Sequence, residues 1–150
     1  MKEIIILGTG GNWFDILDTI NEINLISPKY KCIGFLDDDT DKLGEDYYGS
    51  KVIGSISEAV NFKDVYFVNG VGSSLNFWKK KEIINKTLTP NHRFETIIHP
   101  TSSVSKFSKI GLGTVIFQNV TIASNVKIGS HVIILPNTVV SHDNTCLLYT

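Results

Sequence analysis

His142 and Asp143 are neighbouring residues whose side chains could carry out proton transfer. Free imidazole has a pKa near 6.5, so a histidine can accept a proton at neutral pH, and an adjacent carboxylate can hold or polarise the ring. His142 is also one of 4 histidines in the chain, and it can equally be an ordinary surface residue. The pair is therefore a candidate general base with a candidate orienting acid.

A glycine-rich turn near the start of the chain could bind an anion. Gly8-Thr9-Gly10-Gly11 follows an apolar run and precedes Asn12, where a helical pattern begins. Glycines let backbone N–H groups approach a phosphate, and the amino end of a helix adds a partial positive charge. The third glycine of a dinucleotide fingerprint would fall at Trp13, which argues against a classical pyrophosphate contact. The turn can also serve only to reverse the chain.

Three consecutive acids, Asp37-Asp38-Asp39, end the second apolar run and have three interpretations. Hard cations bind carboxylates, but no glycine-punctuated loop or distal glutamate accompanies them, and we predict no metal site. The carboxylates could instead accept hydrogen bonds from a nucleotide. They could also be only the polar end of a strand.

Apolar runs and helical spacings alternate through the first hundred residues, which predicts a parallel β-α-β sheet. The run at residues 3–8 is continuous, as expected of a central strand covered on both faces. We expect further strands at 31–36, 51–53 and 65–68, an extended piece at 94–98, and helices at 12–25, 57–60 and 75–87. This N-terminal domain is assigned to residues 1–98, before the His99-Pro100 step.

Residues 99–150 form a second domain whose aliphatic residues recur every six positions. The recurring residues are Val104, Ile110, Ile116, Ile122, Ile128, Ile134 and Val140. This period fits neither a helix nor a simple strand, but it fits a chain that turns a corner every six residues and stacks its aliphatic side chains inward. Gly111 and Gly129 suit bends where a side chain would collide with the neighbouring turn. His142 falls at the third position of its repeat and should point away from the stack.

These motifs together resemble the sialic-acid O-acetyltransferase and bacillosamine N-acetyltransferase branch of the hexapeptide-repeat acyltransferases. The resemblance rests on Gly8-Thr9-Gly10-Gly11, Gly34-Phe35-Leu36-Asp37-Asp38, Asn69-Gly70-Val71-Gly72, Ile98-His99-Pro100-Thr101 and the hexapeptides, and it spans essentially the whole chain. It implies a Rossmann-like domain that holds a nucleotide sugar, followed by a left-handed parallel β-helix that binds acetyl-coenzyme A and forms trimers. With 18 residues per coil, residues 104–150 make about 2.6 coils.

The resemblance also assigns roles to particular residues. Gly8, Gly10, Gly11 and Asn12 would border the phosphates or sugar of the acceptor, Asp37 and Asp38 would meet its base or ribose, and Gly70 and Gly72 would form the facing loop. Val140-Ser141-His142-Asp143 matches the context of the catalytic histidine of this family. His142 would be the general base that takes a proton from an acceptor hydroxyl or amine as it attacks the thioester.

Composition and charge exclude several other classes of function. A net charge of −1 argues against a nucleic-acid partner, and we expect the basic run Lys79-Lys80-Lys81 to be solvated surface. The sequence has no apolar run of about 20 residues and no signal peptide, which predicts a cytoplasmic protein without a membrane partner. Cys32 and Cys146 match no metal or redox spacing and are expected to be half-buried.

The hexapeptide register fades at Cys146-Leu147-Leu148-Tyr149-Thr150, which favours a chain truncated within the β-helix. We therefore expect an incomplete acetyltransferase, whose activity on its own is in doubt and which associates into homo-oligomers. The alternative is a non-catalytic module that binds nucleotide sugars and assembles. An NAD-dependent oxidoreductase is disfavoured by Trp13 and by the absence of a substrate domain.

Overall fold

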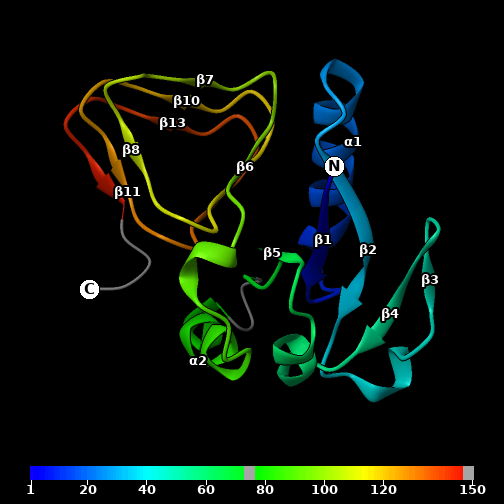
Figure 1. Ribbon diagram of the computed structural model, residues 1–150. Helices are drawn as coiled ribbons and strands as arrows, with labels where there is room; N and C mark the ends of the chain where they lie inside the picture. Colours follow the sequence, from blue (N-terminus) through cyan, green and yellow to red (C-terminus); the bar gives the residue numbers. More distant parts are fainter. Residues whose placement is uncertain (73–76, 147–150) are drawn as a thin grey trace.

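The computed structural model describes residues 1–72 and 77–146, and the chain passes from a sheet-and-helix unit into a column of short strands (Figure 1). The elements of the first unit are β1 (Lys2–Leu7), α1 (Asn12–Ile26), β2 (Tyr30–Leu36), the 3-10 helix η1 (Thr40–Lys42), β3 (Asp46–Tyr47), β4 (Ser50–Gly54), η2 (Ile56–Asn61), β5 (Tyr66–Asn69), η3 (Phe77–Lys79), α2 (Lys80–Lys86) and η4 (Asn91–Arg93). The column consists of β6 (Ile97–Ile98), β7 (Ser103–Val104), β8 (Lys109–Ile110), β9 (Val115–Ile116), β10 (Thr121–Ile122), β11 (Lys127–Ile128), β12 (Ile133–Ile134), β13 (Val139–Val140) and β14 (Thr145–Cys146).

The sheet has the strand order β3-β4-β2-β1-β5, with β4, β2, β1 and β5 parallel and β3 antiparallel to β4. The parallel sheet and the central place of β1 are as expected from the sequence, and Ile4, Ile5, Ile6 and Leu7 are fully buried. The hairpin of β3 and β4 was not expected. The described part of the predicted helix at 75–87 is split into η3 and α2, and positions 75–76 lie outside the described residues.

Both faces of the sheet are covered, but by different partners. Ile4, Ile6 and Phe35 pack against α1 on one face, through Ile16 and Ile20. On the other face Ile5, Leu7, Leu36 and Phe67 join Ile56 of η2 and Ile84 of α2. Apolar side chains buried on both faces leave the ends of the parallel strands as the places where polar groups gather.

The second unit is a three-walled parallel column. Its walls are the stacks β12-β9-β6, β13-β10-β7 and β14-β11-β8. Ile122 pairs with both Val104 and Val140, 18 positions away on either side, so three six-residue sides make one coil as expected. The walls and the coil length confirm a parallel β-helix, while its left-handed sense stays a prediction.

The six-residue aliphatic period fills the interior of the column. Its buried core contains Ile116, Ile122, Ile128 and Ile134 together with Val120, Val126 and Val132, and Val104, Ile110 and Val140 pack partly buried against it. Each fully buried aliphatic side chain contributes roughly 1.5–3 kcal/mol. The predicted inward stack is confirmed.

From the Ile110 repeat onward, the corners of the column lie at the fourth position of each repeat, not at Gly111 and Gly129. The residues there adopt a left-handed backbone, and they are Gly113, Asn119, Asn125, His131, Asn137 and Asp143, with φ between 56° and 70°. Asn, Asp and Gly adopt this conformation at the lowest cost. Gly111 is needed for the other predicted reason, because a Cβ there would overlap the backbone of Gly129 in the next coil.

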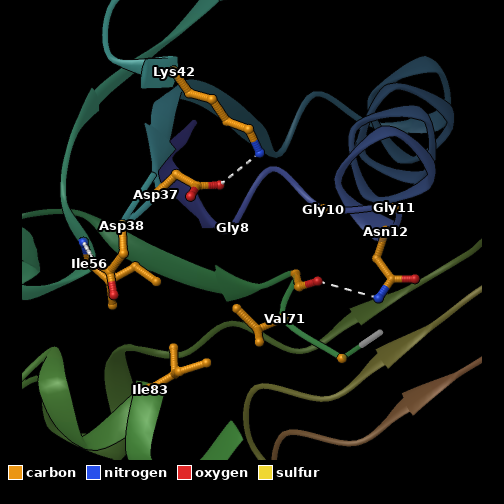
Figure 2. A pocket seen from close by; sticks show the side chains of 12 residues that line it. Gly8, Gly10, Gly11, Asn12, Asp37, Asp38, Lys42, Ile56, Val71 and Ile83 are labelled. Atoms are coloured by element: carbon orange, nitrogen blue, oxygen red, sulfur yellow. Dashed lines mark hydrogen bonds and ion pairs between the residues drawn. The ribbon is translucent and has the colours of Figure 1, made fainter. Parts of the chain in front are cut away.

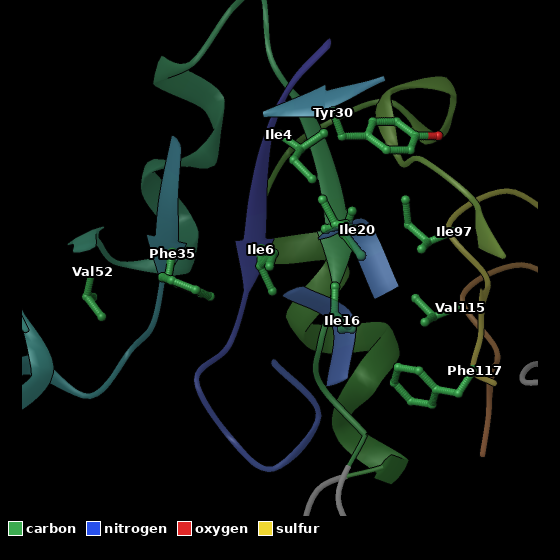
Figure 3. Packing of buried hydrophobic residues seen from close by; sticks show 11 residues of the cluster. Ile4, Ile6, Ile16, Ile20, Tyr30, Phe35, Val52, Ile97, Val115 and Phe117 are labelled. Carbon is green, nitrogen blue, oxygen red and sulfur yellow. The ribbon is translucent and has the colours of Figure 1, made fainter. Parts of the chain in front are cut away.

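One wall of the column packs against the first unit. Ile97, Val115 and Phe117 of the β6-β9-β12 side join the same buried cluster as Ile16 and Ile20 of α1 (Figure 3). Residues 97–98, which the sequence analysis placed at the end of the N-terminal domain, pair with β9 and so form the first rung of this wall. The division at residue 98 is otherwise still a prediction.

Candidate functional site

A cavity of about 250 Å³ lies at the carboxyl ends of β1, β2 and β5 (Figure 2). In the sheet, β2 lies on one side of β1 and β5 lies on the other. The strand order therefore reverses at β1. In open parallel sheets such a crevice is the usual place for a ligand. The cavity is lined by Gly8, Gly10, Gly11, Asn12, Asp37, Asp38, Lys42, Ile56, Gly70, Val71, Gly72 and Ile83.

All eight residues expected to touch the acceptor therefore line one cavity, although they come from three separate segments. Lys42, Ile56, Val71 and Ile83 line it as well and were not expected. The sequence signal for Lys42 was its position in the short Thr40–Lys42 turn that follows the acids at the end of β2. Ile56, Val71 and Ile83 add apolar walls that only the packing of η2, β5 and α2 creates.

The first glycine turn has the conformation that its composition suggests. Gly8 has φ of +83°, which strongly favours glycine. A Cβ on Gly10 or Gly11 would meet no atom within 4 Å, so this part of the turn faces open space. Asn12 begins α1 and donates from Nδ2 to the carbonyl oxygen of Gly70 at 3.3 Å, which ties the two glycine turns together.

Asp37 holds the first turn in place. Its Oδ2 accepts hydrogen bonds from the backbone N–H and the hydroxyl of Thr9, and its Oδ1 accepts from the N–H of Asp39. Burial alone would raise the pKa of Asp37, but these hydrogen bonds and the charge of Lys42 outweigh it, and the net pKa is lowered. The carboxylate is therefore ionised and largely occupied by its own chain.

Asp38 is more open than Asp37. Its Oδ1 accepts from the backbone N–H of Ile56 at 3.0 Å, and its Oδ2 lies 3.3 Å from the ammonium of Lys86. Its side chain is about half exposed. A carboxylate that has spare lone pairs and borders apolar walls can accept further hydrogen bonds from a ligand.

Trp13 does not line the cavity. Its indole packs against the ring of Phe35 of β2, with centroids 5.5 Å apart, and against the ring of Tyr47, 4.7 Å away, on the β3 hairpin that the sequence analysis missed. The indole is therefore not part of the cavity wall beside the first glycine turn. Trp13 instead joins α1 to the edge of the sheet.

The second glycine turn is shaped by close packing. A Cβ on Gly70 would lie 2.8 Å from the carbonyl oxygen of Leu7, and one on Gly72 would lie 3.0 Å from Nζ of Lys80. Lys80 is only 3% exposed, and its ammonium donates to the carbonyl oxygen of His131 at 3.1 Å. Burial lowers the pKa of Lys80 to about 8. The expectation that Lys79-Lys80-Lys81 is solvated was thus wrong for Lys80, which joins α2 to the column.

His142 and Asp143 form a contact at an exposed corner of the column. Nδ1 of His142 lies 2.7 Å from Oδ2 of Asp143, and the two side chains are 78% and 65% exposed. The hydrogen bonds from Asn125 of the coil below, at 2.6 Å, and from His142 lower the pKa of Asp143. The carboxylate is therefore ionised, so Nδ1–H donates to it and Nε2 keeps a lone pair directed elsewhere.

The candidate base and the cavity lie on different sides of the molecule. His142 lies between β13 and β14, at the corner shared by the β13-β10-β7 and β14-β11-β8 walls. The third wall, β12-β9-β6, is the one that packs against α1. In Figure 1 the β13–β14 corner lies at the far left of the column, away from the sheet. A three-walled column places this corner opposite the wall that contacts the first unit.

The fold has counterparts among solved structures. The acetyltransferase domain of PglB from Neisseria gonorrhoeae FA1090 superimposes with a TM-score of 0.76 and 22% identity over 97% of this chain and 69% of that one, and the same domain has been solved with acetyl coenzyme A. Perosamine N-acetyltransferase from Caulobacter crescentus, solved with CoA and GDP-perosamine, gives a TM-score of 0.79 and 18% identity over 97% of this chain and 65% of that one.

This chain shares the fold of these acetyltransferase structures. No protein-family model matches the sequence, and no curated protein matches it. At 18–22% identity the likeness establishes the fold. The chain spans about two thirds of the length of the acetyltransferase chains that it matches.

In residues 1–72 and 77–146, no three or more His, Cys, Asp or Glu side chains gather in a way that could hold a metal ion. Within the same residues, no helix has both the length and the apolar character needed to span a membrane. Cys32 and Cys146 are both free thiols of intermediate burial, as expected.

Proposed function

We propose that this chain belongs to an acetyltransferase that moves the acetyl group of acetyl-coenzyme A to an amino or hydroxyl group of a nucleotide-linked sugar. The observation that carries the proposal is the His142–Asp143 pair, in which Nδ1 is engaged and Nε2 is available on a fold shared with acetyltransferases. Both acetyltransferases described above were solved with acetyl coenzyme A or CoA, which supports acetyl-coenzyme A as the co-substrate.

In the proposed reaction, Nε2 of His142 takes the proton of the acceptor hydroxyl or amine as that group attacks the thioester carbonyl. A C–O or C–N bond forms, the C–S bond breaks, and the leaving thiolate takes up a proton. Asp143 keeps the ring oriented through Nδ1 and stabilises the imidazolium that forms. Asn125 holds Asp143 from the coil below.

The acceptor's nucleotide is assigned to the cavity of the first unit, which we interpret as a Rossmann-like nucleotide-sugar domain. The open backbone at Gly10 and Gly11 suits phosphate or sugar, and the facing turn at Gly70–Gly72 closes the other side. Asp38, half exposed beside Ile56 and Ile83, suits the base or ribose. The perosamine acetyltransferase was solved with a nucleotide sugar, GDP-perosamine, which supports this class of acceptor.

From the separate placement of the cavity and His142 we infer that a second copy of the chain completes the site. In one copy, the β12-β9-β6 wall faces the first unit, and His142 lies at the corner away from it. A neighbouring copy can present its own His142 to the cavity. The homotrimer implied by the sequence resemblance would provide that arrangement three times.

The proposal is tested by release of CoA thiol from acetyl-coenzyme A in the presence of UDP-, GDP- and CMP-linked amino sugars. We expect turnover with at least one of them in a protein that contains this chain together with the further coils implied by the sequence resemblance, and a loss of at least about 100-fold in its His142→Ala variant. His92→Ala is the matched control, because His92 is an exposed histidine in η4 and should leave the rate unchanged.

Other outcomes would contradict the proposal. Equal rates in the wild type and His142→Ala would remove His142 as the base. Calorimetric binding of a nucleotide sugar without any CoA release would favour the non-catalytic binding and assembly module. Tight binding of NAD in place of nucleotide sugars would return the oxidoreductase alternative.

A further inference from the structure

We infer that Lys42 is the residue that reads the phosphate groups of the acceptor, so that the cavity selects sugars carrying a nucleoside diphosphate over neutral sugars. This inference rests on the proposed function and deepens it, since it assigns a specificity-determining role to a residue outside the motifs of the sequence analysis. Three observations support it: the position of the Lys42 ammonium, the N–H donors that this ammonium can still offer to a ligand, and the negative charge of the cavity wall.

The ammonium of Lys42 reaches over the first glycine turn. Nζ donates to the hydroxyl of Thr9 at 3.1 Å, and Thr9 lies between Gly8 and Gly10 on the cavity lining. Figure 2 shows the side chain extending from η1 toward the Gly8–Gly10 backbone. An anion held by the open backbone of this turn would therefore lie close to the charge.

Lys42 still has donors to offer a ligand. Of its three N–H groups, one is engaged by the Thr9 hydroxyl. The carboxylate oxygens of Asp37 and Asp39 lie 3.8 Å away, beyond normal hydrogen-bond distance. The side chain is 31% exposed, so the ammonium is reachable from the cavity and is only partly solvated.

The charge of the wall makes this cation necessary. Asp37, Asp38 and Asp39 place three carboxylates around the end of β2, and Lys86 lies 3.3 Å from Asp38 only. A diphosphate entering without Lys42 would meet the ionised Asp37 on the cavity wall without the cation that lies 3.8 Å from it, and like charges repel strongly at such distances. A neutral sugar or a nucleoside would not meet this barrier. Lys42 should therefore matter for phosphate and little for the rest of the acceptor.

The experiment compares the calorimetric affinities of UDP and GDP with those of uridine and guanosine, for the wild type and three variants. We expect Lys42→Met to weaken nucleoside diphosphate binding about tenfold or more while nucleoside binding is unchanged, because one charge-assisted contact is lost. Lys42→Arg should retain most of the affinity. Lys29→Met is the matched control, because it removes an equal charge at the amino end of β2, whereas the cavity lies at the carboxyl end of that strand.

The outcomes separate this inference from the proposed function. If Lys42→Met weakens both ligand classes equally, or neither, while the wild type binds nucleoside diphosphates, the inference about Lys42 is overturned and the proposed function stands. If the wild type binds no nucleoside diphosphate, both are overturned. Melting temperatures of the variants identify a folding defect, and in that case Lys42→Arg decides, since a loss of diphosphate selectivity in this variant would contradict the inference.

Discussion

Two corners of the same column carry histidines with opposite properties. His131 lies at the corner against the first unit, is 3% exposed, and has Nε2 2.7 Å from Oδ1 of Asn91. Burial, and then the charge of Lys80, lowers the pKa of His131 to about 4. His142 lies at the corner away from the first unit, exposed and paired with Asp143.

The two histidines differ in what surrounds the imidazole ring. His131 is neutral at physiological pH, and its ring packs edge-on against Phe94 with centroids 4.7 Å apart. His142 is one position earlier in its repeat, and its Nε2 faces solvent. What lies against the corner decides whether the imidazole stabilises the fold or is available for chemistry.

The largest expected difference between the two corners is in stability. His131→Ala should lower the free energy of unfolding by roughly 3–5 kcal/mol, because it leaves a cavity beside Phe94 and puts alanine in a left-handed backbone. His142→Ala should change it by less than about 0.5 kcal/mol. Urea unfolding followed by circular dichroism measures both, and equal effects would contradict the comparison.

Gly113→Ala tests the tight packing of the His131 corner from the residue that faces the imidazole ring. Gly113 has φ of +70°, and an added Cβ would lie 2.5 Å from Nδ1 of His131. Strain and overpacking together should cost roughly 2–4 kcal/mol. The double variant Gly113→Ala with His131→Asn should recover part of this loss, since a smaller side chain would make room. No recovery would mean that the backbone strain alone sets the cost.

Acid pH should lower the stability of the protein through the buried His131. The pKa of His131 is about 4 in the folded chain and near 6.5 when unfolded, so the unfolded state binds the proton more readily. Stability should therefore fall as pH drops from 6.5 to 4, by up to about 3 kcal/mol. Urea unfolding at pH 7, 5 and 4 measures it. In His131→Asn, which keeps a residue suited to the corner, this part of the acid sensitivity should vanish, and its persistence would assign the effect to other groups.

Of these variants, Asp143→Asn should have the smallest effect on stability. Asparagine already occupies the left-handed corners at positions 119, 125 and 137, so the fold should be retained. Loss of the carboxylate removes the stabilisation of the imidazolium, and kcat should fall by about tenfold, with the melting temperature unchanged. A full kcat in this variant would show that Asp143 does not assist His142.

The sequence predicted the column well because its order is periodic. One aliphatic side chain every six residues can be buried only if the chain turns at the same interval, and Ile116, Ile122 and Ile128 are buried accordingly. Gly111 and Gly129 were expected at bends, but the left-handed corners lie two positions later in the repeat, where Asn119, Asn125 and Asn137 recur. The recurrence of asparagine at one repeat position indicates left-handed backbone there, but only the glycines were interpreted as bends.

The cavity was predicted from its glycines and acids, and its remaining walls could not be. Gly8, Asp37 and Gly70 follow strands that any parallel sheet would bring to one edge. Ile83 and Lys42 reach the cavity only because α2 and η1 pack where they do. Burial of Lys80 was missed for the same reason, since a run of three lysines looks solvated until the column covers one of them.

The central claim is that the cavity of one copy and His142 of another make one active site. The most direct measurement mixes two variants, His142→Ala and Gly10→Trp, each of which should be inactive alone. Gly10 has open space around its Cβ position, so the indole should fill the cavity without disturbing the fold. Co-refolded mixtures should regain CoA release, because a mixed oligomer can pair an intact cavity with an intact His142. Mixed oligomers that form but stay inactive, beside active wild type, would contradict it.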